Sequence, residues 1–505
     1  MSTTNSQTLE QNLFKLADTL RGAVSPSDYK HIVLGLVFLK YISDSFKKLH
    51  QEIIDRNDGS DPEDEDEYLA VNCFWVPLEA RWSSLHAKSK LPTIGEDLDK
   101  AMEAIERENP NLKNVLPKVY NKESLDSSAI GKLLDIITDI DLGKNADESK
   151  DLLGRVYEYF LGQFADKEGS KGGEFFTPKS IVGLMVEMLE PYEGRVYDPC
   201  CGSGGMFIMS EKFIKEHQGK LDNISVYGQE LNQATYRLCK MNLAIHGLNS
   251  NNIKWNNQGT LLSDGNPDLK ADFVLANPPF NISEWSGNLL KEDKRWKYGV
   301  PPNGNANFAW LQHMSYHLSN KGLAGIVLAN GSLSSQTSGE GDIRRQLVES
   351  GLVECIVALP KQLFFNTGIP ACIWILSKEK ELNKKIDVLF IDATEIGFMQ
   401  DRVHRAFAKT DLEHISSTYH NWKKSPENYQ DTPGFCKSAS LEELTKHNFV
   451  LTPGRYVGLK ATLDDGIPLS TKINALTKTL GEQMQKEKEL DEEIRTQLAK
   501  IGFEF

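Results

Sequence analysis

A four-residue motif, Asn277-Pro278-Pro279-Phe280, follows a short apolar run that is predicted to be a strand. Each proline removes a backbone N–H and restricts the chain, so carbonyl oxygens are left as acceptors. The amide oxygen of Asn277 is a further acceptor, and the ring of Phe280 offers a face for stacking. These parts suit a planar group that carries an amine, which can attack an electrophilic carbon directly once it is positioned. We expect all four residues to be catalytic, the alternative being an ordinary Asn-Pro turn.

A glycine-rich turn, 198–206 (DPCCGSGGM), follows an earlier predicted strand. Its glycines permit a sharp turn and close approach to a ligand, and the helix after it begins with exposed N–H groups. Asp198 can hold an ammonium group, and Glu230, at the end of the next strand, can bind the two hydroxyls of a ribose. The turn has no Lys or Arg to bind phosphates. S-adenosylmethionine, a nucleoside with an amino acid and no phosphate, fits best; a dinucleotide site or a structural turn are the alternatives.

The elements that position these motifs are read from the alternation of apolar runs and helical segments between residues 151 and about 397. Predicted strands end at Asp198, at Glu230 and near Asn277, and helical patterns separate them. This alternation is typical of an α/β domain with a mostly parallel sheet. Ligands of such sheets bind beyond the carboxyl ends of the strands, so the candidate residues are expected to lie together at that edge.

Three domains are predicted, at residues 1–150, 151–425 and 426–505. The first is mostly helical, with apolar spacing from Leu9 to Leu20 and again from Ile32 to Phe46. The acidic run 58–67 is predicted to be a solvated loop. The last 35 residues place apolar side chains at helical spacing among many Glu, Lys and Gln. We expect a long amphipathic helix that docks on a partner, or one that packs against its own domain.

Length and composition exclude several classes of protein. The chain has 505 residues, is 40% hydrophobic and carries a net charge of −14. Because basic side chains that neutralise phosphates supply much of the affinity for DNA, an acidic chain of this kind is not expected to bind DNA tightly without a partner. The N-terminus does not resemble a signal peptide, and the early apolar run 32–39 is too short to span a membrane. Seven cysteines, two of them adjacent and the rest scattered without metal-binding spacing, favour a reduced, cytoplasmic compartment. The phosphate-binding loop of ATP-driven motors does not occur in the sequence.

Other chemistries fit less well. Pro199-Cys200 has the form of the cysteine nucleophile of cytosine carbon-5 methyltransferases, but it lies inside the glycine turn. We therefore expect the cysteine to pack beneath a cofactor. His313 and His317 share a helical face without the glutamate of an H-E-x-x-H site, so no metal is assigned. The segment 291–298 (KEDKRWKY) is either a DNA contact or a surface loop.

The sequence is similar to a known family. DPCCGSGGM together with NPPF resembles the amino-group DNA methyltransferases of the adenine-N6 kind, and GGEFFTP, 172–178, resembles their second cofactor motif. Further segments, among them NANFAWLQH and LTPGRYVG, resemble the methyltransferase (M) subunit of type I restriction–modification systems. The match runs from about residue 10 to 460. Methyltransferases that act on protein glutamine or RNA share the NPPF-type motif, but the helical N-terminal domain, the C-terminal helix and the total length argue against them. An inactive assembly protein could keep the fold, but the intact NPPF and DPCCGSGG motifs count against it.

The resemblance implies a Rossmann-like S-adenosylmethionine-dependent methyltransferase domain behind a helical N-terminal domain. It implies transfer of a methyl group to N6 of an adenine flipped out of a DNA duplex, which protects host DNA. A specificity (S) subunit would read the DNA sequence, two M subunits would join one S subunit, and restriction (R) subunits would add ATP-driven cleavage. No membrane partner is expected.

The resemblance also implies roles for individual residues. Asn277 and the Pro278 carbonyl would hold the amine, and Phe280 would stack on the adenine. The family usually has Gly-Asp-Thr-Leu after the third strand, where this chain reads NQGTL, 257–261. Asn257, Gln258 or Asp264 are the candidates for the contact that the missing acid would make. The residues expected to bind the cofactor are Glu174, Phe175, Phe176, Thr177, Pro178, Asp198, Cys200, Gly202, Ser203, Gly204, Gly205, Glu230 and Asn257.

Overall fold

The computed structural model describes residues 26–71, 73–122, 125–138, 155–163, 177–217, 223–364, 369–383, 385–459 and 469–500. The chain divides into two compact units, Met1–Gly458 and Leu459–Phe505, which are considered separately. The helical pattern expected from Leu9 to Leu20 lies outside the described residues. Of the helices within the described ranges, none is both long and apolar enough to cross a membrane.

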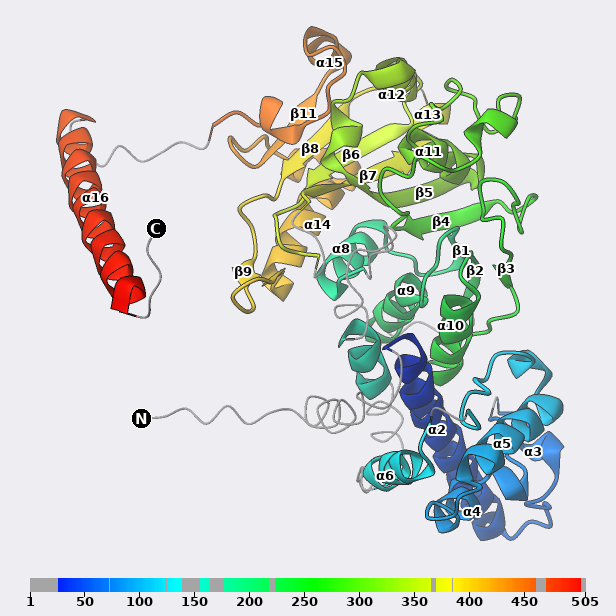
Figure 1. The fold of residues 1–505 in the computed structure, drawn as a ribbon. Coiled ribbons are helices and arrows are strands. Elements are labelled where there is room, and N and C mark those ends of the chain that lie inside the picture. Colours follow the sequence, from blue (N-terminus) through cyan, green and yellow to red (C-terminus); the bar gives the residue numbers. More distant parts are fainter. Residues whose placement is uncertain are drawn as a thin grey trace. The chain divides into compact units, whose positions relative to one another are not determined.

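A sheet of nine strands, counted over the described residues, forms the centre of the α/β part of the larger unit (Figure 1). The strand order is β11-β8-β6-β7-β5-β4-β1-β2-β3, in which β7 and β11 run antiparallel to their neighbours and the other adjacent pairs are parallel. This arrangement confirms the predicted α/β fold class. The strands are β1 (Gly194–Asp198), β2 (Ile224–Glu230), β3 (Ile253–Trp255), β4 (Ala271–Ala276), β5 (Leu318–Ala329), β6 (Val353–Ala358), β7 (Ala371–Ser377), β8 (Val388–Asp392) and β11 (Cys436–Ala439).

Helices cover both faces of the sheet. One hydrophobic core lies between the sheet and α8, α9, α10 and α14, and a second lies between the opposite face and α11 and α12. Because β6 and β7 are buried along their whole length, their sequences are apolar almost without interruption. The remaining elements of this part are α8 (Lys179–Leu189), α9 (Gly205–Glu216), α10 (Gln233–Ile245), α11 (Asn307–Tyr316), α12 (Glu340–Glu349), α13 (Lys378–Leu382), α14 (Lys409–Lys424), α15 (Leu441–Lys446), β9 (Phe398–Met399) and β10 (Arg405–Ala406).

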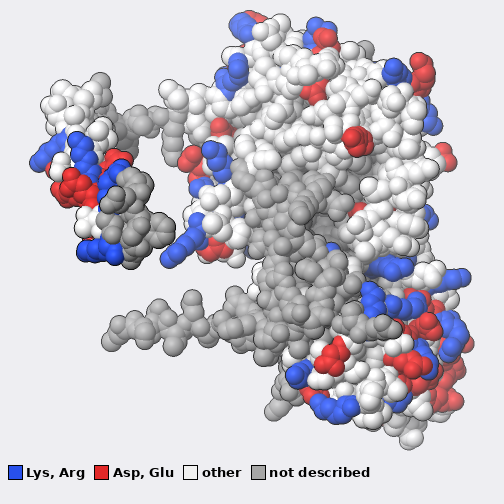
Figure 2. Space-filling model, in the orientation of Figure 1, with Lys and Arg blue, Asp and Glu red and all other residues white. Residues whose placement is uncertain are grey.

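The N-terminal part is helical, as predicted; its described residues up to position 138 contain no strand. Figure 2 shows charged side chains of both signs gathered over this part, at the lower right, and few on the visible face of the sheet domain. The acidic run 58–67 is mostly exposed, and a short helix begins within it. The helices are α2 (Pro26–Arg56), α3 (Glu65–Leu69), α4 (Trp82–Ala87), α5 (Ile94–Glu108) and α6 (Ser127–Thr138), followed by a helix at 155–163.

Helix α10 joins the helical part to the sheet. Leu238, Met241 and Ile245 lie on one face and belong to the hydrophobic core of the N-terminal helices. Cys239 and Leu243 lie on another face and pack in the core of the sheet. Helix α10 therefore packs against the N-terminal helices on one face and against the sheet on another.

The smaller unit contains α16 (Leu469–Lys500), which confirms the predicted long amphipathic helix. Its apolar side chains stay about half exposed or more within this unit, from 49% to 70% of their surface. The exposed apolar residues of α16 are Ile473, Leu476, Leu480, Met484, Leu490 and Ile494. The predicted domain limits at residues 150 and 425 stay a prediction.

Candidate active site

A cavity of about 540 Å³ opens at the carboxyl edge of the sheet. β1, β2 and β4 run parallel, with Asp198 paired to Gly228 and Tyr197 paired to Val274, so the polar residues after these strands reach the same edge. Its volume is typical of a small-molecule site. Seven of the predicted cofactor-binding residues line this cavity: Thr177, Asp198, Cys200, Gly202, Ser203, Gly205 and Glu230.

The glycine turn has a shape that side chains oppose. Gly202 and Gly204 have φ values of 53° and 85°, in the left-handed region. A Cβ atom on Gly204 would lie 3.0 Å from the Cys239 sulfur, whereas one on Gly202 would meet no atom within 4 Å. The Gly202 N–H donates to a carboxylate oxygen of Glu230 at 2.9 Å, which ties the turn to the end of β2. The backbone therefore borders the cavity without side chains to fill it.

Asp198 is a buried acid of the cavity whose pKa lies far from its usual value. It is 3% exposed, and its carboxylate accepts the Cys200 backbone N–H at 3.0 Å. Burial, with a smaller contribution from the charge of Glu230, raises the pKa of Asp198 to about 7. A bound ammonium group would supply an opposite charge and so stabilise the ionised form of this buried carboxyl. Burial also raises the pKa of the Cys200 thiol well above its usual range, which disfavours a thiolate nucleophile.

Asn277 follows β4 and is oriented by a residue far away in the sequence. Its side-chain N–H donates to the Thr177 hydroxyl oxygen at 2.9 Å. The side-chain oxygen is buried and has no hydrogen-bond partner among the described residues. An unpaired buried acceptor costs about 1–3 kcal/mol, so its presence beside a cavity indicates a ligand that donates a hydrogen bond.

The rest of the NPPF motif is placed differently from Asn277. Pro279 lines the cavity, whereas Pro278 and Phe280 do not. Phe280 is 8% exposed and packs against Phe364 with perpendicular rings, whose centroids are 5.7 Å apart. Among the described residues, the aromatic side chains that line the cavity are Trp285 and Trp310.

Sequence reasoning missed both tryptophans. Trp285 lies in the loop shortly after the NPPF motif, and its indole N–H donates to the Pro302 carbonyl at 3.2 Å. The indole nitrogen of Trp310, on α11, is buried without a hydrogen-bond partner in the described part of the chain. The closeness of Trp285 to the motif was a usable signal, whereas only packing brings α11 to the cavity.

Several predicted residues lie elsewhere. Pro178 and Gly204 do not line the cavity, and Asn257 is exposed outside it. Glu174, Phe175 and Phe176 lie outside the described residues.

Three residues were candidates to replace the acid that the family has in this loop. Of these, Gln258 lines the cavity, whereas Asn257 and Asp264 do not. Asn256 fixes this loop, because its side-chain oxygen accepts the backbone N–H groups of Gln258 at 3.0 Å and Gly259 at 2.9 Å. Asp264 instead bonds to His317 at 2.9 Å.

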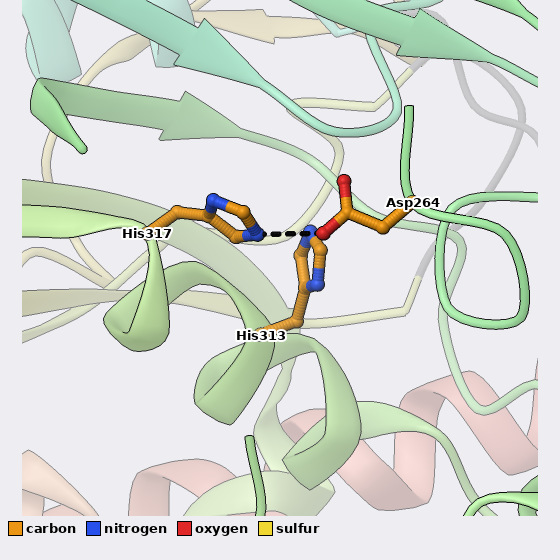
Figure 3. A group of neighbouring side chains, drawn as sticks. All are labelled: Asp264, His313 and His317. Carbon is orange, nitrogen blue, oxygen red and sulfur yellow. Dashed lines mark hydrogen bonds and ion pairs between the residues drawn. The ribbon is translucent and has the colours of Figure 1, made fainter. Parts of the chain in front are cut away.

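Asp264, His313 and His317 form the one group within the described ranges whose spacing could hold a metal ion (Figure 3). Arg295 donates to Nδ1 of His313 at 2.9 Å, so the ring proton is left on Nε2, beside the Tyr197 hydroxyl at 3.1 Å. A histidine that binds a metal uses the lone pair of one ring nitrogen and carries the proton on the other. In His313 the lone pair of Nδ1 already accepts a hydrogen bond from Arg295, and Nε2 carries the proton. We interpret the cluster as a buried hydrogen-bond network.

The network also holds the loop that lines the cavity. Arg295 is buried, and its guanidinium donates to the Leu261 carbonyl at 2.6 Å and to Asp293. Although burial opposes ionisation, the hydrogen bond from His317 is the main cause that lowers the pKa of Asp264 to about 2. In the segment 291–298, only the lysines and Glu292 are exposed, and Lys297 is already paired with Glu381. The two alternatives for this segment, a DNA contact or a surface loop, stay open.

The fold and the cavity define an S-adenosylmethionine-dependent methyltransferase. The family model of the N-6 DNA methylases matches residues 148–465, and that of the HsdM N-terminal domain matches residues 9–138. The chain therefore belongs to the N-6 DNA methylases, as the adenine-specific methylase subunit of a type I restriction–modification system. The cofactor fits the residues present, because the cavity combines buried carboxylates with a glycine turn that carries no phosphate-binding cation.

Relatives and a solved structure agree with this assignment. The HindI methylase subunit of Haemophilus influenzae is 47% identical over 85% of this chain and all of its own length. The MjaIX methylase subunit of Methanocaldococcus jannaschii is 37% identical over 98% of this chain and 91% of its own. The crystal structure of a type I methyltransferase subunit from Streptococcus thermophilus has a TM-score of 0.77 at 27% identity, covering 89% of this chain and 98% of that one.

Proposed function

We propose that this chain transfers a methyl group to N6 of an adenine that has left the DNA duplex, by direct displacement without a covalent enzyme intermediate. The observation that carries this proposal is the buried, unpaired side-chain oxygen of Asn277 beside the cavity. An exocyclic amine is the donor that such an acceptor needs. A base inside the duplex cannot reach a buried acceptor, which supports base flipping.

The residues of the site would position the amine rather than react with it. The Asn277 oxygen and the Pro278 carbonyl would each accept one amine hydrogen, which draws the nitrogen lone pair out of conjugation with the ring. Thr177 holds the Asn277 amide in the required orientation. Phe280 stays our proposal for the residue that stacks on the base; without a base its ring packs at right angles to Phe364 and does not line the cavity. S-adenosylmethionine supplies an electrophilic methyl group on its sulfonium.

The cofactor would be held by the predicted residues at the edge of the cavity. Asp198 would pair with the ammonium group of the cofactor, and Glu230 would accept hydrogen bonds from its ribose. Gly202 and Ser203 would let the backbone approach it closely. Gln258 replaces Asn257 in our proposal for the contact with the adenine ring, because Gln258 lines the cavity and Asn257 does not.

We further propose an assembly of two such chains with one specificity subunit, joined by restriction subunits, on DNA. The half-exposed apolar side chains of α16 support a docking role for this helix. The acidic net charge supports a division of labour in which the specificity subunit makes most of the sequence-reading contacts.

Labelled S-adenosylmethionine with genomic DNA and the cognate specificity subunit tests the proposal. We expect label in N6-methyladenine, measured by mass spectrometry of DNA digests. Asn277→Ala should lower the transfer rate at least about a hundredfold, because it removes a group that acts in the transition state. The affinity for the cofactor should stay nearly unchanged in calorimetry.

A matched control is Asn249→Ala, which removes an exposed side-chain amide outside the cavity and should leave transfer intact. Label in protein or RNA without label in adenine would refute the proposed reaction. Loss of cofactor binding in Asn277→Ala would show that Asn277 has been assigned to the wrong ligand.

A further inference from the structure

The helical N-terminal part contributes directly to the cavity of the methyltransferase part. Lys30, on α2, and Leu161, on the helix at 155–163, line the same cavity as Asp198 and Asn277. Neither residue belongs to a motif that the sequence singled out, and Lys30 is half-buried. The site is therefore built from both parts of the larger unit.

Helix α10 explains how α2 reaches the site. The Tyr41 hydroxyl donates to the Ile245 carbonyl at 2.7 Å, which fixes the middle of α2 beside the end of α10. Lys30 precedes Tyr41 by about 16 Å along its helix, and Thr235 precedes Ile245 by about 15 Å. Since Lys30 and Thr235 line the same cavity, the two helices run side by side in the same direction, and both point their N-terminal ends toward the carboxyl edge of the sheet.

The charges of the cavity are unequal. Its described lining has three carboxylates, on Asp198, Glu230 and Glu284, and a single basic side chain, Lys30. S-adenosylmethionine carries two positive groups, the sulfonium and the ammonium, and a single negative group, the carboxylate of its methionyl part. Opposite charges pair favourably in a partly buried site, whereas a carboxylate facing only acids would be repelled.

We infer that Lys30 binds the carboxylate of S-adenosylmethionine, so that the cofactor bridges the helical N-terminal part and the methyltransferase part. The position of Lys30 favours the cofactor over a DNA phosphate. Leu161 and Leu238 line the same cavity and are buried. Apolar side chains of this kind suit a small ligand better than the phosphates of a duplex. A lysine from the helical part then makes cofactor binding depend on how α2 is seated against α10.

A pair of ligands isolates the contact. The probes are S-adenosylmethionine and its decarboxylated form, which keeps the sulfonium and the amine but lacks the carboxylate. In calorimetry on the full chain, Lys30→Met should weaken S-adenosylmethionine about ten- to a hundredfold, the usual loss for a hydrogen bond to a charged group. The decarboxylated ligand should bind the wild-type protein and Lys30→Met equally well, and Lys30→Arg should restore most of the affinity for S-adenosylmethionine.

Two controls distinguish a contact with the carboxylate from a loss of folding and from a contact with DNA. Unchanged binding of the decarboxylated ligand also shows that Lys30→Met is folded, and Lys113→Met, an exposed lysine of the same helical part, should behave as the wild type. Equal weakening of both ligands would overturn the inference. Unchanged affinity for S-adenosylmethionine together with weaker DNA binding would overturn it in favour of a phosphate contact. Because binding is measured rather than transfer, the result does not depend on which amine is methylated.

Discussion

Asp198 should make the affinity for S-adenosylmethionine depend on pH near neutrality. Burial raises the pKa of this carboxyl to about 7, and only its ionised form can pair with an ammonium group. As the pH falls below this value, binding must first displace a proton, so the affinity decreases. An exposed aspartate would give no such dependence, because it stays ionised throughout this range.

The expected size follows from the ionised fraction of Asp198. With a pKa of about 7 it is about nine-tenths ionised at pH 8 and about one-tenth ionised at pH 6, so the dissociation constant should rise about tenfold between them. Without cofactor, the raised pKa makes the protein less stable as the pH rises, which is the reverse of its effect on affinity. The contribution to the free energy of unfolding is present below pH 4 and is lost as the pH rises through 7.

Calorimetry at pH 6, 7 and 8 on the wild-type protein and on Asp198→Asn measures the effect. The amine of the ligand also titrates near pH 8, and Asp198→Asn reports that contribution because it cannot ionise at this position. We expect the variant to bind more weakly at pH 8 and to lose the additional tenfold dependence. The same pH dependence in both proteins would refute the assignment of Asp198 to the ammonium group.

Three further changes follow from local geometry. Gly204→Ala should lower the thermal midpoint more than Gly247→Ala, because both have positive φ but only Gly204 would place its Cβ against a sulfur; equal shifts would contradict the clash. Leu476→Ser with Leu480→Ser on α16 should weaken assembly with the specificity subunit in gel filtration while cofactor affinity stays constant, and unchanged assembly would count against the docking role. A chelator should not change the thermal midpoint, because Arg295 opposes a cation in the histidine cluster; a fall would indicate a bound metal.

The sequence by itself determined the class of fold and the chemistry at the strand ends. Alternating strands and helices require a mostly parallel sheet, and the carboxyl ends of parallel strands meet at one edge. Asp198, Glu230 and Asn277 could therefore be placed together before any contact was known, because Asp198 and Glu230 end their strands and Asn277 comes directly after its strand. The long amphipathic helix at the C-terminus was predictable for a similar reason, since its periodicity is local.

Only the tertiary structure decided which other residues complete the cavity. Lys30 belongs to no motif, and the segment NANFAWLQH that contains Trp310 gave this side chain no role. Each residue reaches the site because helices distant in the sequence pack against the sheet or against α10. Gln258 lines the cavity and Asn257 does not, because hydrogen bonds from the backbone to the Asn256 side chain set the shape of this loop. The spacing of residues in the sequence cannot predict that shape. The orientation of Asn277 likewise depends on Thr177, which lies 100 positions away. Local periodicity fixes the elements, but contacts between distant segments depend on how side chains of both elements fill a common core.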